Sequence, residues 1–153
     1  MILHFAYGSN MSRAIMRRHA PAAQPVGMAV LPDYRFLITT DGYATIAPRR
    51  AQAVCGVLWR LTPRDRVMLD RWENIAGGQY RAVTLPVRLD GRLRPALIYV
   101  ARRSRVGVPK AGYLEIVVSA ARAWELPPKY IASLQRWLPV QPRGTGTRRL
   151  GDL

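Results

Sequence analysis

Cysteine is almost absent from this chain of 153 residues, and with Cys55 as its one thiol no intrachain disulfide can form. A chain without disulfides suits a reducing compartment. Apolar runs are short as well, and none approaches the roughly 18 residues that a membrane-spanning helix needs. The first ten residues place no Lys or Arg ahead of their short apolar stretch, so they do not fit a secretory signal. We therefore expect a soluble, cytoplasmic protein.

Acidic residues are scarce. Only 9 Asp and Glu stand against 24 Lys and Arg, which gives a formal net charge of +15. Such an excess either attracts nucleic acid or another anionic surface, or reflects composition alone, with the bases spread over solvated faces. The arginines occur in short runs such as Arg17-Arg18 and Arg148-Arg149, never in a block of five or six. We favour composition and keep nucleic-acid binding as an alternative that no motif supports.

The length suits one domain. Hydrophobic residues make up 49% of the chain and charged residues 22%, which are values typical of globular proteins. Because the pattern of strands and helices ends near residue 140, we predict a single domain over residues 1–140 and a flexible basic tail over residues 141–153. The sequence leaves the oligomeric state open.

Strand patterns dominate the first half of the chain. Residues 2–8 predict a strand that ends at Gly8, and a short helix is expected over Arg13–His19 after the capping residue Ser12. Prolines and an Asp-Gly turn then separate four short predicted strands. These strands are Val26–Val30, Tyr34–Thr40, Tyr43–Ala47 and Ala53–Leu61.

The segment Thr62–Asp65 is typical of a helix start. It offers a capping Thr, a Pro at the first helical position and an Asp at the capping-box position. We expect this helix to end near Asn74 or Ile75, ahead of two glycines.

The second half of the chain predicts a hairpin followed by two helices. The strand Tyr80–Leu89 turns into the strand Pro95–Ala101, and helices are expected over Lys110–Trp124 and from Pro128 to the segment that contains Trp137 and Leu138. Hairpins of this kind favour an α+β fold, with a mixed β-barrel or curved sheet and flanking helices, over a doubly wound sheet.

The connection Tyr7-Gly8-Ser9-Asn10 is the first candidate site. Gly8 allows the backbone to approach a ligand closely. The amides of Ser9, Asn10 and Met11 would point out of a helix N-terminus, which suits an anion or an oxyanion. A plain capped connection explains the same residues equally well.

Glu73 is the second candidate. It lies at the edge of the apolar stripe of its predicted helix, which comprises Met68, Leu69, Trp72 and Ala76. A carboxylate in half-apolar surroundings has a raised pKa, as a general base that works near neutral pH requires. The alternative is an ion pair with Arg66 or another arginine.

Other polar residues carry weaker signals. Tyr80 and Tyr113 offer hydroxyl groups near a pocket, although ordinary packing explains most tyrosines. His4 and His19 lack a partner at ligand spacing, so we expect no metal site. Cys55 lies in an apolar strand and is expected to be a core residue. No phosphate loop or dinucleotide fingerprint is present, so we expect no cofactor.

Two blocks of the sequence match one known pattern. The first is Phe5-Ala6-Tyr7-Gly8-Ser9-Asn10-Met11. The second comprises Cys55–Pro63, Leu69–Glu73 and Tyr80–Val87, which follow a G-V-L/V-W/Y strand, a helix with L-D-x-x-E and a Y-x-x-x-x-V strand. Together they resemble the γ-glutamylcyclotransferase-like (AIG2-like) family. The match covers most of residues 2–138, and the two motifs are specific when they occur in this order.

The resemblance implies a small α+β fold built on a mixed β-barrel with a cavity at one end. It also implies that Glu73 matches the catalytic glutamate of the family. The substrate-binding positions that it implies are Tyr7, Gly8, Ser9, Asn10, Tyr80 and Tyr113. The family commonly has Gly after the glutamate, where this chain has Asn74. Because Asn also adopts the left-handed conformation that ends helices, we expect the turn to be kept.

The activity implied by the resemblance is intramolecular aminolysis of a γ-glutamyl group, which yields 5-oxoproline and a free amino acid or amine. The implied partner is a small γ-glutamyl molecule, and one carboxylate that acts as base and then as acid suffices, without metal or cofactor. Two alternatives stay open. One is a non-catalytic ligand-binding module on the same fold, and the other is a basic protein that binds nucleic acid or another anion.

Overall fold

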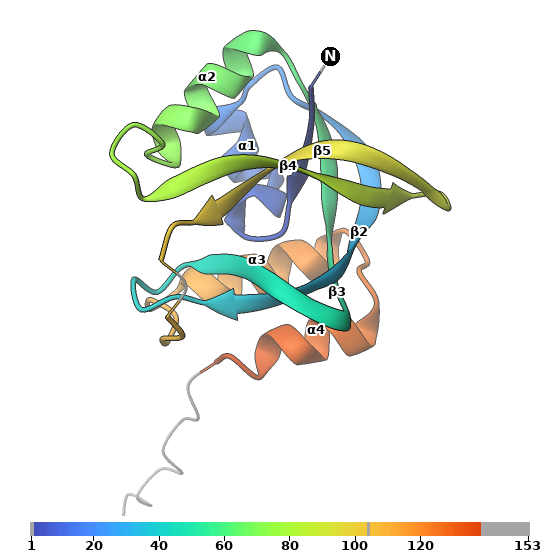
Figure 1. Cartoon of the computed structure of the whole chain (residues 1–153), viewed down its shortest axis with the longest axis vertical. Coiled ribbons are helices and arrows are strands. Elements are labelled where there is room, and N and C mark those ends of the chain that lie inside the picture. Colours follow the sequence, from blue (N-terminus) through green and yellow to red (C-terminus); the bar gives the residue numbers. More distant parts are fainter. Residues whose placement is uncertain (1, 104, 139–153) are drawn as a thin grey trace, which may run out of the picture.

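Five strands close into a barrel in the order β1-β3-β2-β4-β5 (Figure 1). In this computed structural model, which describes residues 2–103 and 105–138, β1 pairs parallel with β5 and the other neighbours are antiparallel. The strands are β1 (Ile2–Ala6), β2 (Gln24–Ile38), β3 (Ala44–Leu61), β4 (Tyr80–Leu89) and β5 (Arg92–Ala101). The prediction of an α+β fold with a mixed β-barrel is confirmed.

Helices cover the barrel on two sides. Figure 1 shows α1 (Arg13–His19) and α2 (Pro63–Trp72) beside β1, and α3 (Tyr113–Ala123) packed with α4 (Pro128–Gln135) at the opposite end. A single 3₁₀ turn, η1 (Ser9–Met11), connects β1 to α1. The predicted bounds of α1 and β4 are confirmed. No helix in the described part of the chain is long and apolar enough to cross a membrane.

The four predicted strands between residues 26 and 61 are two long strands. The prediction of a break at Pro32-Asp33 was wrong, because β2 absorbs these residues as an irregularity in its pairing with β3. Asp33 takes a left-handed φ of 62°, and its Oδ1 accepts a hydrogen bond from the Ala51 amide of β3 at 3.1 Å. Pro48 likewise does not end a strand, since β3 continues through it.

The middle of β3 is buried on both faces, as its apolar pattern predicts. Val54, Val57 and Leu58 are fully inaccessible to solvent. Gly56 permits the close approach of β1, since a Cβ there would lie 2.3 Å from the Ala6 carbonyl oxygen and 2.8 Å from the Phe5 ring. The tight β1–β3 contact fixes the strand that leads into η1.

The predicted ends of three helices need correction. α2 ends at Trp72 rather than at residues 74–75, because Asn74 has a left-handed φ of 52°, which terminates the helix without a glycine. α3 begins at Tyr113 and not at Lys110, after a left-handed Gly112. α4 ends at Gln135, so Trp137 and Leu138 lie beyond it, half-buried against the core.

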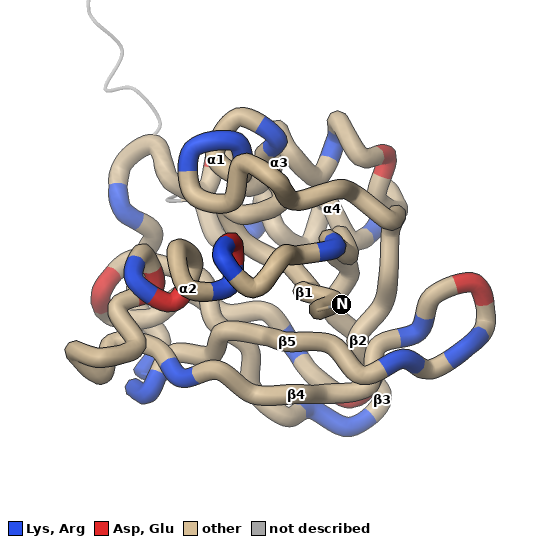
Figure 2. Tube along the Cα trace, turned by 90° about the horizontal axis from the view of Figure 1, so that it is seen from above, with Lys and Arg blue, Asp and Glu red and all other residues tan. Residues whose placement is uncertain are grey.

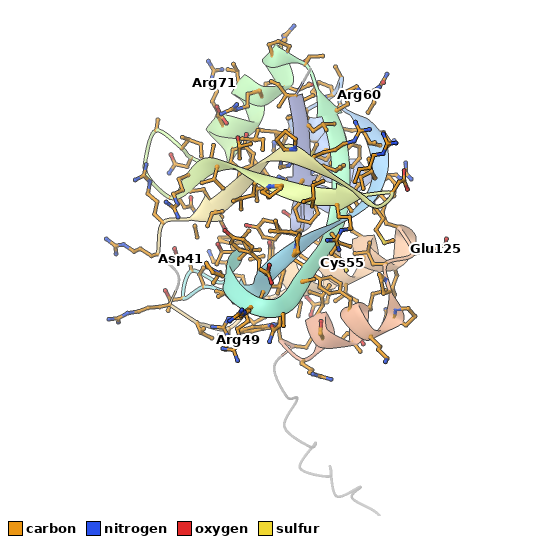
Figure 3. All side chains as sticks on the ribbon, turned by 45° about the vertical axis from the view of Figure 1, so that its right-hand side comes forward. Asp41, Arg49, Cys55, Arg60, Arg71 and Glu125 are labelled. Atoms are coloured by element: carbon orange, nitrogen blue, oxygen red, sulfur yellow. The ribbon has the colours of Figure 1, made fainter. Side chains whose placement is uncertain are left out.

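Basic residues are distributed around the fold. Figure 2 shows Lys and Arg on helices, strand ends and loops alike, and in Figure 3 Arg49, Arg60 and Arg71 project outward while Cys55 lies in the core. Among the described residues, the one ion pair joins Arg66 to Asp70 at 3.2 Å. This distribution favours the compositional interpretation of the charge. The predicted basic tail, residues 141–153, lies outside the described residues.

The capping box of α2 is formed by Thr62 and Asp65. The Thr62 hydroxyl accepts from the Asp65 amide and the Asp65 carboxylate accepts from the Thr62 amide, each at 3.1 Å. The same carboxylate also accepts from the Ala22 amide at 3.2 Å, which ties the start of α2 to the segment after α1.

We expect Thr62→Ala to lower the free energy of unfolding by about 1 kcal/mol, because one helix-terminal amide loses its acceptor. Thr62→Ser keeps the hydroxyl and serves as the matched control. Urea unfolding followed by circular dichroism measures both, and equal losses in the two variants would contradict the assigned cap.

Candidate functional site

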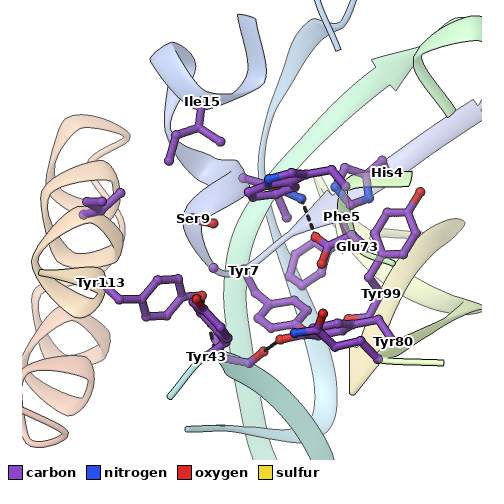
Figure 4. Close-up of a pocket in the computed structure, with 17 residues that line it drawn as sticks. His4, Phe5, Tyr7, Ser9, Ile15, Tyr43, Glu73, Tyr80, Tyr99 and Tyr113 are labelled. Carbon is purple, nitrogen blue, oxygen red and sulfur yellow. Dashed lines mark hydrogen bonds between the residues drawn. The ribbon is translucent and has the colours of Figure 1, made fainter. Parts of the chain in front are cut away.

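A pocket of about 360 Å³ lies where β1 runs into η1, beneath the end of α2 (Figure 4). This volume is within the range of small-molecule sites. All seven residues proposed from the sequence line it: Tyr7, Gly8, Ser9, Asn10, Glu73, Tyr80 and Tyr113. They come from five separate elements or loops, so the fold brings together residues that are more than 100 positions apart in the sequence.

Glu73 is the one acidic side chain among the residues that line the pocket. It caps the C-terminal end of α2, with its amide donating to the Leu69 carbonyl at 2.9 Å, and the left-handed Asn74 then turns the chain away. Burial raises the pKa of the Glu73 carboxyl to about 7, against the lowering effect of a hydrogen bond from Asn10. That bond joins Asn10 Nδ2 to Glu73 Oε1 at 3.1 Å (Figure 4).

The pKa of Glu73 stays raised because no described basic residue lies beside its carboxyl. The ion pair with Arg66 considered for Glu73 is not formed, because Arg66 pairs with Asp70. None of the described Lys and Arg residues lines the pocket. A cation beside Glu73 would favour its charged form and lower its pKa. Burial therefore raises the pKa of Glu73, and in this chain of 24 basic residues no described cation lines the pocket to lower it.

The η1 turn differs in one respect from the predicted site for an anion or an oxyanion. The Met11 amide donates to the Gly8 carbonyl at 3.1 Å and is therefore not available to a ligand, contrary to the prediction. The amides of Ser9 and Asn10 precede the first hydrogen bond of the turn and are not consumed by it. Gly8 makes room for a side chain, since a Cβ there would lie 2.9 Å from the Tyr113 hydroxyl.

Tyrosine hydroxyls surround the carboxyl of Glu73. Tyr80 donates to the Ala44 carbonyl at 2.9 Å, Tyr113 accepts from the Ala44 amide at 3.3 Å, and Tyr7 donates to the Tyr99 carbonyl. Burial raises the pKa of Tyr113 to about 12 and those of Tyr7 and Tyr80 well above the ordinary value. These hydroxyls stay protonated near neutral pH, so they position groups rather than act as bases.

His4 and Tyr99 also line the pocket, although the sequence did not single them out as site residues. Nδ1 of His4 lies 3.0 Å from the Leu97 carbonyl, and burial lowers the pKa of His4 to about 4, so the ring is neutral. Tyr99 packs edge-on against His4 and donates to Asp70 at 2.7 Å. The sequence holds no local signal for these two residues, because they become part of the pocket only when α2 covers this side of β1 and β5 in the folded chain.

Two residues of the predicted apolar stripe on α2 do not lie in the core. Trp72 is 38% exposed, and its ring stacks on His19 of α1 with centroids 4.2 Å apart. Ala76 lies beyond the end of the helix and is exposed. Leu69 is fully buried as predicted. The stripe is therefore narrower than the pattern predicted, and stacking between helices replaces burial in the core for Trp72.

Metal-binding side chains do not gather in the described part of the chain, where no group of three His, Cys, Asp or Glu residues is close enough to hold an ion. Cys55 is buried, and burial raises the pKa of its thiol, as for a core residue. The pocket chemistry within the described residues therefore rests on Glu73, amides, hydroxyls and the neutral His4.

Comparison with known proteins gives consistent matches. Residues 53–134 match the model of the AIG2-like family. The chain is 24% identical to the gamma-glutamylcyclotransferases of Mus musculus and of Homo sapiens, over 99% of this chain and 86% of each relative. It is similar in fold to a solved gamma-glutamyl cyclotransferase, with a TM-score of 0.83, 23% identity and coverage of 95% of this chain and 90% of that one. YkqA from Bacillus subtilis gives 0.79 at 26% identity, over 94% of this chain and 56% of that one.

We expect Asn10→Leu to raise the pKa of Glu73 above its wild-type value. Leucine keeps the burial but removes the amide that favours the ionised carboxylate. A ¹³C NMR titration of labelled glutamate carboxyls measures the shift, and with only three glutamates in the chain few signals need to be assigned. Ser9→Ala is the control, and an unchanged or lower pKa in Asn10→Leu would refute the assigned role of the hydrogen bond.

Proposed function

The chain belongs to the AIG2-like, γ-glutamylcyclotransferase-like family, and on that basis we propose that it cyclises a γ-glutamyl group to 5-oxoproline. The reaction would release the attached amino acid or amine, with Glu73 as the general acid and base. The observation that carries the proposal is the Glu73 carboxyl itself, half-buried in a pocket of substrate size with its pKa raised to about 7.

The chemistry requires a group that accepts and then returns a proton. The α-amine of a γ-glutamyl group is protonated at neutral pH and cannot attack until a base removes one proton. Its nitrogen then forms a bond to the carbon of the γ-carbonyl group and loses a second proton. The bond between that carbonyl carbon and the leaving nitrogen breaks, and the leaving nitrogen takes up a proton. A carboxyl with a pKa near 7 exchanges protons in both directions at low cost.

Positioning is the second requirement, because amine and carbonyl of one molecule must be held face to face. The amide of Asn10, which η1 does not consume, is suited to the α-carboxylate or to the oxyanion that develops on the γ-carbonyl, whereas the Ser9 backbone interacts with the Tyr113 hydroxyl. The Tyr113 hydroxyl already accepts one hydrogen bond from Ala44 and keeps its own proton to donate. Ser9 and Tyr113 lie on the opposite side of the pocket from His4 in Figure 4.

We expect Glu73→Gln to reduce kcat for 5-oxoproline release by about 10²–10⁴-fold, the usual contribution of a general acid–base group. The assay measures 5-oxoproline from a panel of γ-glutamyl dipeptides and γ-glutamyl amines. Glu115→Gln, an exposed glutamate on α3, is the matched control and keeps wild-type rates. Full activity in Glu73→Gln on the best substrate would reject the mechanism.

The pH profile follows from the same carboxyl. Because the ionised form of Glu73 is the base, kcat/KM rises with pH with a midpoint near 7 and levels off above it. In Asn10→Leu the midpoint moves to higher pH, in step with the titration described above. A midpoint near 4.5 in the wild type, the ordinary value for a glutamate, would contradict the raised pKa of Glu73 on which the proposal rests.

A further inference from the structure

The mouth of the pocket is apolar, in contrast to the polar groups around Glu73. Among the residues that line the pocket, three are exposed to solvent: Trp72, Gln79 and Ile116. The exposed fractions of Trp72 and Ile116 are 38% and 43%, and neither side chain carries a charge. Large apolar side chains that stay in water at the edge of a pocket mark a surface that a ligand covers. The part of a substrate that leaves the pocket therefore meets an apolar surface.

Trp72 is held in the mouth by the contact between α1 and α2. Its ring stacks on His19 with centroids 4.2 Å apart and planes inclined by 19°. Burial and the charge of Arg18 lower the pKa of His19, so the ring behind Trp72 is neutral at pH 7. Ile15, which also lines the pocket, lies one helical turn before His19 and on the same face of α1. Ile15 and Trp72 thus form a neutral, apolar side of the mouth.

Ile116 extends the apolar mouth onto α3. It follows Tyr113 by three positions, so the two side chains are neighbours on one helix face. Figure 4 shows Ile15 of α1 and Tyr113 of α3 on the same side of the pocket, away from His4 and Tyr99. The three helices α1, α2 and α3 each contribute one side chain, and we refer to Ile15, Trp72 and Ile116 as the apolar rim.

The apolar surface continues beyond the rim. Ile116 also lines a second groove, between η1 and α3. The Trp124 indole N–H in this groove donates to the Met11 carbonyl at 2.7 Å, and the Arg13 guanidinium lies 3.8 Å from the centre of its ring. The indole is therefore fixed, with its polar atom already paired. The other apolar residues of the groove lining are Met11, Ala120 and Ala123.

The proposed reaction sends one part of the substrate through this mouth. The γ-glutamyl group must lie beside Glu73, where its amine gives up a proton, so the leaving group extends outward. A separate polar groove lies beyond Tyr43 and Gln79 and contains Asp41, Arg103 and Lys110. These three side chains are exposed and of both signs, so water screens them. Contact with the apolar rim, by comparison, gains free energy because it removes apolar surface from water.

Resting on the proposed cyclisation, we infer that the leaving group of the substrate is apolar and packs on Ile15, Trp72 and Ile116. The substrate class is then a γ-glutamyl derivative of an amine with an extended alkyl chain or an aromatic ring. The pocket with Glu73 holds the γ-glutamyl group, and the apolar rim selects what is attached to it. Derivatives of short amines lack this contact and are poorer substrates.

A homologous series of substrates tests the inference. The γ-glutamyl derivatives of methylamine, butylamine and hexylamine differ only in the alkyl chain, and their leaving nitrogens have nearly the same basicity. Each methylene contributes about fourfold to binding when it is fully buried. We expect kcat/KM to rise at least about tenfold from methylamine to butylamine, and further to hexylamine. The rise appears as a lower KM at nearly constant kcat, because the rim contacts the substrate and the transition state alike.

Variants of the rim separate apolar contact from other causes. Ile116→Ser lowers the ratio of kcat/KM for the butylamine and methylamine derivatives about threefold or more, whereas Ile116→Leu keeps the ratio. Ile15→Ser lowers it in the same way from α1. Val67→Ser is the matched control, since Val67 is 50% exposed on α2 and lines neither the pocket nor the two grooves. Circular dichroism verifies that each variant is folded.

Failure of the inference differs from failure of the proposed function. If the wild type cleaves the three derivatives with equal kcat/KM, or if kcat/KM falls with chain length, the apolar subsite is refuted while the cyclisation stands. The same ratio in Ile116→Ser and Val67→Ser refutes it as well, since the gain would then not come from the rim. If the folded wild type releases 5-oxoproline from no γ-glutamyl compound, both proposals fall.

Discussion

Withdrawal of one carboxyl group from water, at the end of α2, is the constraint on which the candidate site depends. An ionised carboxylate in such a place costs several kcal/mol unless a partner charge or a proton compensates. The chain has arginines in excess, yet Arg66 is engaged by Asp70 and the pocket lining holds no described cation. Burial therefore raises the pKa of Glu73 to about 7, against the lowering effect of the hydrogen bond from the neutral Asn10 amide. A salt bridge to an arginine would instead have favoured the ionised carboxylate of Glu73 and lowered its pKa.

Charge is divided between two neighbouring spaces. The pocket combines one titrating carboxyl with neutral hydroxyls, whereas the groove beyond Tyr43 and Gln79 carries Lys110 and Arg103. Lys110 and Arg103 are exposed, so water screens their charges. Within the pocket, exclusion of water strengthens each polar contact. A net charge of +15 thus says little about the chemistry beside Glu73.

Local sequence signals predicted the elements that local chemistry specifies. The cap of Ser12 and the helix Arg13–His19, the capping box of Thr62 and the left-handed Asn74 are all formed, because each involves neighbours in the sequence. Errors arose where partners are distant. β2 passes through Pro32-Asp33 because Ala51 of β3 satisfies the Asp33 carboxylate, and Trp72 leaves the core to stack on His19. The candidate residues came from local chemistry at the Tyr7–Asn10 connection and at Glu73, and the motif resemblance gave them their roles, whereas His4 and Tyr99 required the fold.

The contact between Gly8 and Tyr113 has a consequence for biosynthesis. The Tyr113 hydroxyl fills the space that any side chain at residue 8 would take, so the N-terminal turn and α3 complete one wall together. During translation, a ribosome that has released the first hundred residues has delivered Tyr7, Asn10 and Glu73 but not that wall. Until α3 emerges, the pocket lacks this wall. The surroundings that bury Glu73 are therefore completed only when α3 folds against the N-terminal turn.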